Sequence, residues 1–148
     1  DQFFTGYRQT VLQPGEFIHS IVIPKVTVSP DFVAWKVAKR LDDDISAVFI
    51  AINIQLKDGV VVQARLAFGG MAATPKRATA AEAALNGQPL NQASIEQACA
   101  ALSQDFQPLS DFRASADYRL QVARNLLRRY YAQTCGELTL TEVARYVS

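Results

Sequence analysis

Apolar and polar side chains alternate with a period of two along most of the first half of the chain. This spacing is typical of strands with one buried face, so it predicts β-structure there. The clearest case is Val48, Ile50, Ile52 and Ile54, whose side chains would share one face of a strand. The expected strands cover residues 17–23, 32–37, 47–56 and 60–68.

Turn residues separate these strands. Pro24 would close the first one, because proline has no N–H to donate to a neighbouring strand. Asp58 and Gly59 lie between the two longest strands and favour a tight hairpin, since Asp-Gly accepts the positive φ angles of such turns. Gly69 and Gly70 predict a change of direction after the last strand rather than a phosphate-binding loop, because the G-x-G-x-x-G spacing is missing.

The second half of the chain instead shows apolar positions at helical spacing. A first helix is expected over residues 79–86, ended by Gly87 as a C-cap. Ser94 with Gln97 resembles a capping box at the start of a second helix. The longest helix is expected over residues 115–133, and a short final one over residues 141–146. The buried stripe of the second helix is expected to comprise Ile95, Cys99, Leu102 and Phe106.

Strands followed by helices predict an α+β fold. We expect an antiparallel sheet of about four strands in the N-terminal half, covered on one face by about three helices from the C-terminal half. No internal repeat or low-complexity linker divides the sequence, so residues 1–148 are interpreted as a single domain.

Composition narrows the possible partners. The 148 residues are 49% hydrophobic and carry a formal net charge of +1, which suits a folded core and gives no global attraction to nucleic acid or to an anionic membrane. No apolar run approaches the roughly 18 residues of a membrane span, and no signal peptide is visible. The absence of an initiator Met suggests a piece of a longer protein, and the low cysteine content is typical of the cytoplasm.

Few residues suggest chemistry of their own. Cys99 and Cys135 lack metal-ligand spacing and are expected to be reduced structural thiols. His19 is the only histidine, so a zinc site is not expected. We therefore predict no catalytic residue and no metal ligand in this chain.

Two charged groups leave several interpretations open. Residues 42–44 are three consecutive aspartates after Lys39 and Arg40, and they fit a solvated turn, a weak metal site or an electrostatic loop beside a cofactor. The longest helix carries a basic side, interpreted either as a solvated face near the negative helix end or as a docking surface. This side comprises Arg119, Arg124, Arg128 and Arg129.

Five segments together resemble one family. They are F-F-T-G-Y-R-Q-T-V-L at residues 3–12, P-G-E-F-I-H-S-I-V-I-P at 14–24, W-K-V-A-K-R-L-D-D-D-I-S at 35–46, A-F-G-G-M-A at 67–72 and D-F-R-A-S-A-D-Y-R at 111–119. In this order they resemble the C-terminal domain of the flavoprotein part of molybdenum hydroxylases. The first segment is most similar to the xanthine dehydrogenase branch.

The resemblance implies a function and a set of partners. It implies the C-terminal domain of the FAD-containing part of a bacterial xanthine dehydrogenase, which helps to hold FAD for electron transfer from purine oxidation to NAD. The FAD-binding domain upstream, the iron–sulfur clusters and the molybdenum cofactor would lie on other domains or on the large subunit. This chain alone would not turn over purines.

The resemblance also implies cofactor-binding residues. Ile18 matches an apolar residue that packs against FAD, and Lys36 matches a lysine that contacts it. Residues 39–44 match a loop beside the isoalloxazine, in which Asp43 is the flavin-facing acid and Arg40 a further contact. The family often has a second arginine where this chain has Leu41, and a small polar residue where it has Lys39.

A different class of function remains open. The chain could be an interaction domain that docks the molybdenum subunit through its sheet edge and basic helix, without touching the flavin.

Overall fold

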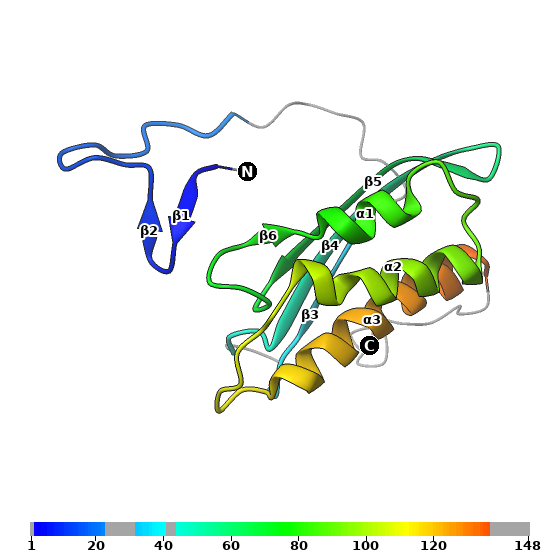
Figure 1. Ribbon diagram of the computed structural model, residues 1–148. Coiled ribbons are helices and arrows are strands. Elements are labelled where there is room, and N and C mark those ends of the chain that lie inside the picture. The colour runs from blue at the N-terminus through cyan, green and yellow to red at the C-terminus, as the bar shows by residue number, and fades with distance from the viewer. Residues whose placement is uncertain (1, 23–31, 41–43, 137–148) are drawn as a thin grey trace, which may run out of the picture.

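A computed structural model of the chain describes residues 2–22, 32–40 and 44–136. Its centre is a four-stranded antiparallel sheet in the order β3-β4-β5-β6 (Figure 1). The strands are β3 (Phe32–Val37), β4 (Val48–Lys57), β5 (Val60–Gly69) and β6 (Lys76–Arg77). The predicted strand over residues 32–37 is confirmed, and the next two strands are correct to within one residue at each end.

The hairpin between β4 and β5 forms as predicted. Asp58 has φ of 52° and Gly59 has φ of 76°, the two positive values that a tight two-residue turn requires. Below the turn, Ile52 pairs with Leu66 and Ile54 with Ala64, and all four side chains are buried on the same face. Because side chains alternate along a strand, the residues between them, such as Phe49, Ala51 and Asn53, lie on the opposite face.

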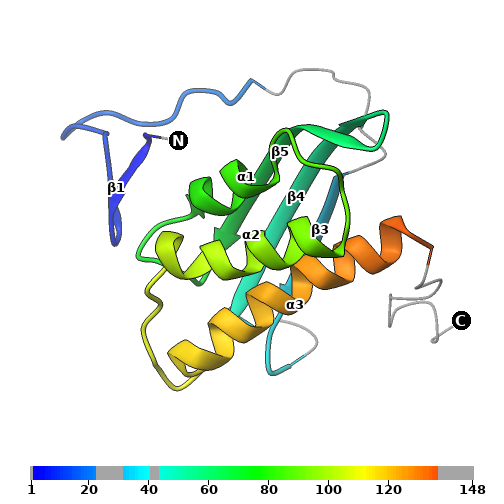
Figure 2. The same ribbon diagram turned by 45° about the vertical axis from the view of Figure 1, so that its right-hand side comes forward.

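Three helices cover one face of this sheet: α1 (Thr79–Leu85), α2 (Gln92–Asp105) and α3 (Ala116–Thr134). Figures 1 and 2 show all three on the same side, with α2 between α1 and α3. The predicted stripe on α2 is confirmed, since Ile95, Cys99, Leu102 and Phe106 are all buried. They close the core against Phe68 and the other inward residues of β4 and β5. The α+β prediction is therefore confirmed.

The start of α2 differs from the prediction. Asn91, not Ser94, is the N-cap, and its side-chain oxygen accepts from the N–H of Ser94 at 2.9 Å. Ser94 Oγ in turn accepts from the N–H of Asn91 at 3.1 Å, which completes a capping box one turn earlier than expected. Both residue types cap well, so spacing alone did not decide between them.

Two carboxylates, those of Asp105 and Glu82, join the short helix α1 to neighbouring elements through hydrogen bonds. Asp105, at the end of α2, accepts from the N–H groups of Ala80 at 2.9 Å and Ala81 at 3.0 Å, and so serves as the cap that α1 lacks in its own sequence. Glu82 is 4% exposed and accepts from the N–H of Leu66 at 2.8 Å. These carboxylates satisfy backbone donors that would otherwise be buried without partners.

The N-terminal segment departs from the prediction. A small hairpin of β1 (Phe4–Gly6) and β2 (Gln9–Thr10) was not expected, and residues 17–22 form no strand. The fourth strand of the sheet is β6 instead. Figures 1 and 2 show the hairpin and the segment after it apart from the four-stranded sheet. Ile23 and the predicted helix over residues 141–146 lie outside the described residues.

Candidate functional site

The sheet face opposite the helices carries Lys36. On β3, Trp35 and Val37 pack towards the helices, so Lys36 between them lies on the other face and is exposed. We call this surface the open sheet face. Its residues, set by the strand register, are Phe32, Ala34, Lys36, Phe49, Ala51, Asn53, Arg65, Ala67 and Gly69.

The middle of the open sheet face is flat. Ala34 pairs with Ala51, and Ala51 pairs with Ala67, so three methyl side chains cross three strands in one row. The neighbouring row contains Lys36 and Phe49, which pair with each other. This arrangement offers a shallow apolar surface beside an exposed ammonium group.

The other predicted cofactor residues are not all brought to this face. Ile18 is 54% exposed and lies in the segment that Figure 1 shows apart from the sheet, so within the described residues it is not brought together with Lys36. Arg40 follows β3 and is exposed. Asp43 lies outside the described residues.

The connection between β3 and β4, residues 38–47, is called the β3–β4 loop. Arg40 donates its backbone N–H to Asp44 Oδ2 at 3.3 Å, and the Arg40 guanidinium lies 3.6 Å from Asp44 Oδ1. Partial burial raises the pKa of Asp44, but the hydrogen bonds and charge of Arg40 outweigh it and leave that pKa lowered. Asp44 therefore stabilises the β3–β4 loop through contacts with Arg40 of the same loop.

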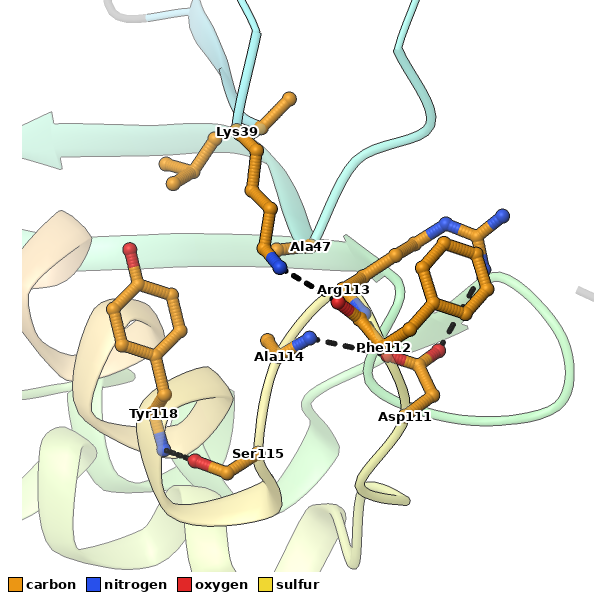
Figure 3. A pocket seen from close by; sticks show the side chains of 10 residues that line it. Lys39, Ala47, Asp111, Phe112, Arg113, Ala114, Ser115 and Tyr118 are labelled. Carbon is orange, nitrogen blue, oxygen red and sulfur yellow. Dashed lines mark hydrogen bonds and ion pairs between the residues drawn. The ribbon is translucent and has the colours of Figure 1, made fainter.

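One end of the β3–β4 loop is fastened to the connection between α2 and α3. Lys39 Nζ donates to the carbonyl oxygen of Phe112 at 2.7 Å (Figure 3). The two segments border a pocket of about 510 Å³, whose lining includes Val37, Asp111 and Tyr118. Lys39 is thus held by a structural contact at the base of the loop.

Arg119 forms the most connected polar group in this region. Its side chain is buried within α3 and donates from Nη1 to the carbonyl oxygens of Ala47 at 2.5 Å and Gly70 at 2.9 Å. From Nη2 it donates to Asp111 Oδ1 at 2.6 Å. One guanidinium therefore joins the end of the β3–β4 loop, the turn after β5 and the segment before α3.

Asp111 completes this group. Its Oδ1 also accepts from the N–H groups of Arg113 at 2.8 Å and Ala114 at 3.1 Å. Burial raises the pKa of Asp111, but these backbone donors and Arg119 outweigh it and lower that pKa to about 2. The carboxylate is therefore ionised at every pH at which the protein would work.

This pKa predicts a specific response to acid. The pKa of an aspartate in an unfolded chain is about 3.9, so ionised Asp111 stabilises the fold above that pH. The contribution is lost as the pH falls through about 2. We expect the wild type to lose more stability between pH 4.5 and 2.5 than Asp111→Asn does, as measured by urea unfolding. Asp117→Asn, in the first turn of α3, serves as the control. Equal acid sensitivity of wild type and Asp111→Asn would contradict the role given to this carboxylate.

The prediction that Arg119 belongs to an exposed basic side of α3 is wrong, because Arg119 is buried. The other three arginines of that side contact neighbouring elements. Arg128 forms a two-point pair with Glu96, with N···O distances of 2.7 and 2.6 Å. Arg124 Nε donates to the carbonyl oxygen of Cys99 at 3.3 Å, and Arg129 stacks on the ring of Trp35 at 4.5 Å. These contacts hold α3 on α2 and β3.

The spacing of residues along α3 indicates that Arg119 is buried. Arg119, Ala123, Leu126 and Tyr130 follow one another at intervals of four, three and four residues, and all are buried. Arg119 thus occupies the first position of the core stripe of α3. An arginine in such a stripe has to find partners within the protein, because an unpaired buried charge is costly.

The remaining candidate groups add no further chemistry. Cys99 is buried, which raises the pKa of its thiol to about 11, whereas Cys135 is exposed at the end of α3. His19 is exposed and lies in no strand, contrary to the prediction. Within residues 2–22, 32–40 and 44–136, no group of three or more His, Cys, Asp or Glu could hold a metal ion. No helix in the same ranges has the length and hydrophobicity needed to cross a membrane.

Known proteins resemble this chain over most of its length. It is 36% identical over 141 residues to a xanthine dehydrogenase of Emericella nidulans, which covers 93% of this chain and 10% of that protein. It is 39% identical over 102 residues to a xanthine dehydrogenase of Drosophila subobscura, which covers 68% of this chain and 8% of that one. The chain thus spans about a tenth of these relatives.

Solved structures agree with this likeness. The carbon monoxide dehydrogenase of Hydrogenophaga pseudoflava superimposes with a TM-score of 0.79 and 28% identity, over 86% of this chain and 44% of that one. Residues 33–134 match the family described as the CO dehydrogenase flavoprotein C-terminal domain. The chain therefore belongs to this family of flavoprotein domains, and the cofactor that the family implies is FAD.

Proposed function

We propose that this chain is the C-terminal, FAD-capping domain of a bacterial xanthine dehydrogenase. Its open sheet face, with Lys36, would cover one side of the flavin cofactor, and residues 1–148 would form one domain of a longer flavoprotein. The observation that carries the proposal is the position of Lys36, exposed beside the flat alanine row and at the base of the β3–β4 loop.

The open sheet face fits the chemistry of FAD. A row of methyl groups accepts a planar ring without steric conflict, and the exposed rings of Phe32 (50%) and Phe49 (37%) add apolar area. Lys36 and Arg65 are exposed cations on the same face, suited to hydrogen bonds with phosphate oxygens or with the polar edge of a flavin. Arg40, which follows β3, would extend this surface, whereas Ile18 would contact FAD from the N-terminal segment, apart from the open sheet face.

FAD, when bound, would supply the electron transfer between purine oxidation at molybdenum and NAD. The residues of this chain would orient the cofactor, exclude water from one side and set the local charge through Asp43. Most of the binding surface would belong to the upstream FAD-binding domain. The iron–sulfur clusters and the molybdenum cofactor would lie on other domains and on the large subunit.

Lys36→Ala in the complete flavoprotein tests the proposal. We expect FAD retention to weaken by about tenfold, because a hydrogen bond to a charged group contributes about 1.5 kcal/mol or more. Equilibrium dialysis of FAD gives the affinity, and NAD reduction gives the activity. Asp43→Ala, on the loop, is expected to leave retention nearly unchanged and to slow NAD reduction.

Lys57→Ala is the matched control, because Lys57 is an exposed lysine at the opposite end of β4 from the β3–β4 loop. Its FAD retention is expected to equal that of the wild type. Unchanged retention in Lys36→Ala together with unchanged NAD reduction in Asp43→Ala would refute the proposed flavin role.

Docking of the molybdenum subunit through α3 is the second candidate function. The contacts of Arg124, Arg128 and Arg129 within the domain weaken it, since these side chains already have partners. A pulldown of the large subunit, with the wild type and with the three arginines changed to alanine, separates the two. Loss of binding in the triple variant would favour docking.

A further inference from the structure

One end of the β3–β4 loop is tied to the segment that precedes α3, and the other end is tied to α3 itself. At the first end, Lys39 Nζ donates to the carbonyl oxygen of Phe112 at 2.7 Å. At the second end, the carbonyl oxygen of Ala47 accepts from Arg119 Nη1 at 2.5 Å. The backbone also closes the loop, because the N–H of Ala47 donates to the carbonyl oxygen of Val37 at 2.8 Å. The base of the loop is therefore held by two side-chain hydrogen bonds to other segments and by one backbone hydrogen bond between its own ends.

The two ties meet at one carboxylate. Asp111 accepts from Arg119 Nη2 at 2.6 Å and from the N–H groups of Arg113 and Ala114. These bonds fix the backbone around Phe112, whose carbonyl oxygen receives Lys39. A movement of Asp111 would therefore displace partners at both ends of the loop.

Arginine is required for this arrangement. A guanidinium presents several N–H donors in fixed directions within one plane, whereas a lysine ammonium is a single point on a flexible stem. Arg119 uses that geometry to join three carbonyl or carboxylate acceptors, those of Ala47, Gly70 and Asp111. The side chain is 5% exposed, so water does not readily replace a lost hydrogen bond.

We infer that Arg119, held by Asp111, is a positioning residue that sets the place of the β3–β4 loop relative to the sheet. Its direct effect is on the backbone of Ala47. The consequence for a flavin rests on the proposed function, because it requires that the loop carrying Asp43 face the cofactor. Arg119 touches neither the cofactor nor a substrate in this assignment and acts through the loop alone.

Amide hydrogen exchange in Arg119→Lys tests the direct effect. The probe is the N–H of Ala47, and the reference is the N–H of Leu66, which donates to Glu82 in the core. We expect exchange at Ala47 to accelerate by about tenfold more than at Leu66, because a lost bond to a charged group changes a local equilibrium by that order. Arg128→Lys is the control, since Arg128, like Arg119, belongs to α3, but it lies on the surface and pairs with Glu96 of α2.

Asp111→Asn supplies a second variant should Arg119→Lys fold poorly. It keeps the size of the side chain but weakens the bond to Arg119, so a smaller increase of the same kind is expected at Ala47. Equal acceleration at Ala47 and Leu66 in both variants would overturn the inference, because Arg119 would then only stabilise the whole fold.

The midpoint potential of the flavin in the complete flavoprotein separates this inference from the proposed function. Exchange that accelerates more at Ala47 than at Leu66, together with a shifted midpoint potential, supports both the inference and the proposed function. Selective exchange with an unchanged potential keeps Arg119 as the residue that positions the loop and refutes the placement of the loop beside the flavin. An unchanged exchange pattern refutes the inference whatever Lys36→Ala does to FAD retention.

Discussion

Glu82→Ala is expected to lower the free energy of unfolding by about 3 kcal/mol. Glu82 is buried on α1, where Oε1 accepts from the N–H of Leu66 at 2.8 Å and from Arg77 Nε at 2.9 Å. The substitution leaves a buried backbone donor of β5 without its acceptor. It also removes the carboxylate beside Arg77, although the cost of that loss is reduced by the 36% exposure of the arginine side chain.

Two variants make this expectation specific. Glu82→Gln keeps an oxygen for Leu66 and loses the charge, so it is expected to cost about half as much. Glu96→Ala breaks the exposed pair with Arg128 and is expected to lower the stability far less than Glu82→Ala does, because solvent screens an exposed ion pair. Denaturant unfolding measures all three. A cost for Glu82→Ala no larger than that for Glu96→Ala would show that the buried carboxylate is not needed at this place.

Gly70→Ala is expected to cost about 2–4 kcal/mol, the sum of positive-φ strain and a steric conflict. Gly70 has φ of 78°, and a Cβ there would lie 2.5 Å from the carbonyl oxygen of Ala47. That oxygen is the acceptor of Arg119, so the added methyl group would also disturb the base of the β3–β4 loop.

Gly69→Ala is the matched control, one residue away. A Cβ at Gly69 would meet only the Cβ of Phe49 at 3.5 Å, an ordinary contact, and its φ is not positive. Its cost is expected to stay below about 1 kcal/mol. Thermal and denaturant unfolding of the two variants give the comparison, and equal costs would contradict the steric argument.

The parts of the fold that the sequence predicted correctly have a local cause. The strand over residues 32–37 was predicted from its alternating side chains, and the same alternation puts Lys36 on the face opposite Trp35 and Val37. The turn at Asp58 and Gly59 is also set by the residues themselves.

The parts that were missed depend on distant partners. Residues 17–22 have a β-rich composition but pair with no strand among the residues that the structure describes, whereas Lys76 and Arg77 become a strand because they pair with the edge of β5. Secondary structure of this kind is decided by pairing rather than by propensity. The position of Asp105 as the cap of α1, across 25 residues of sequence, is equally beyond a local pattern.

The candidate site shows the same division. Lys36 could be placed from its strand, but the Arg119–Asp111 contact needed the tertiary fold, even though D-F-R-A-S-A-D-Y-R contains both residues. The helical stripe through Arg119, Ala123 and Leu126 was visible in the sequence and indicates burial. It does not reveal which carbonyl groups an arginine would bridge, because those lie just before β4 and just after β5.

The two-residue turn at Asp58 and Gly59 has a consequence for the order in which the sheet assembles. Closing so short a loop costs little chain entropy, so β4 and β5 can pair early, before distant parts of the chain meet. Strand β3 joins the same sheet through the longer β3–β4 loop and lies at its edge. We expect β3 to dock late and to open first, and Lys36 to move with it. A ligand bound on that strand would then stabilise the last step of assembly, by mass action, more than it stabilises the core.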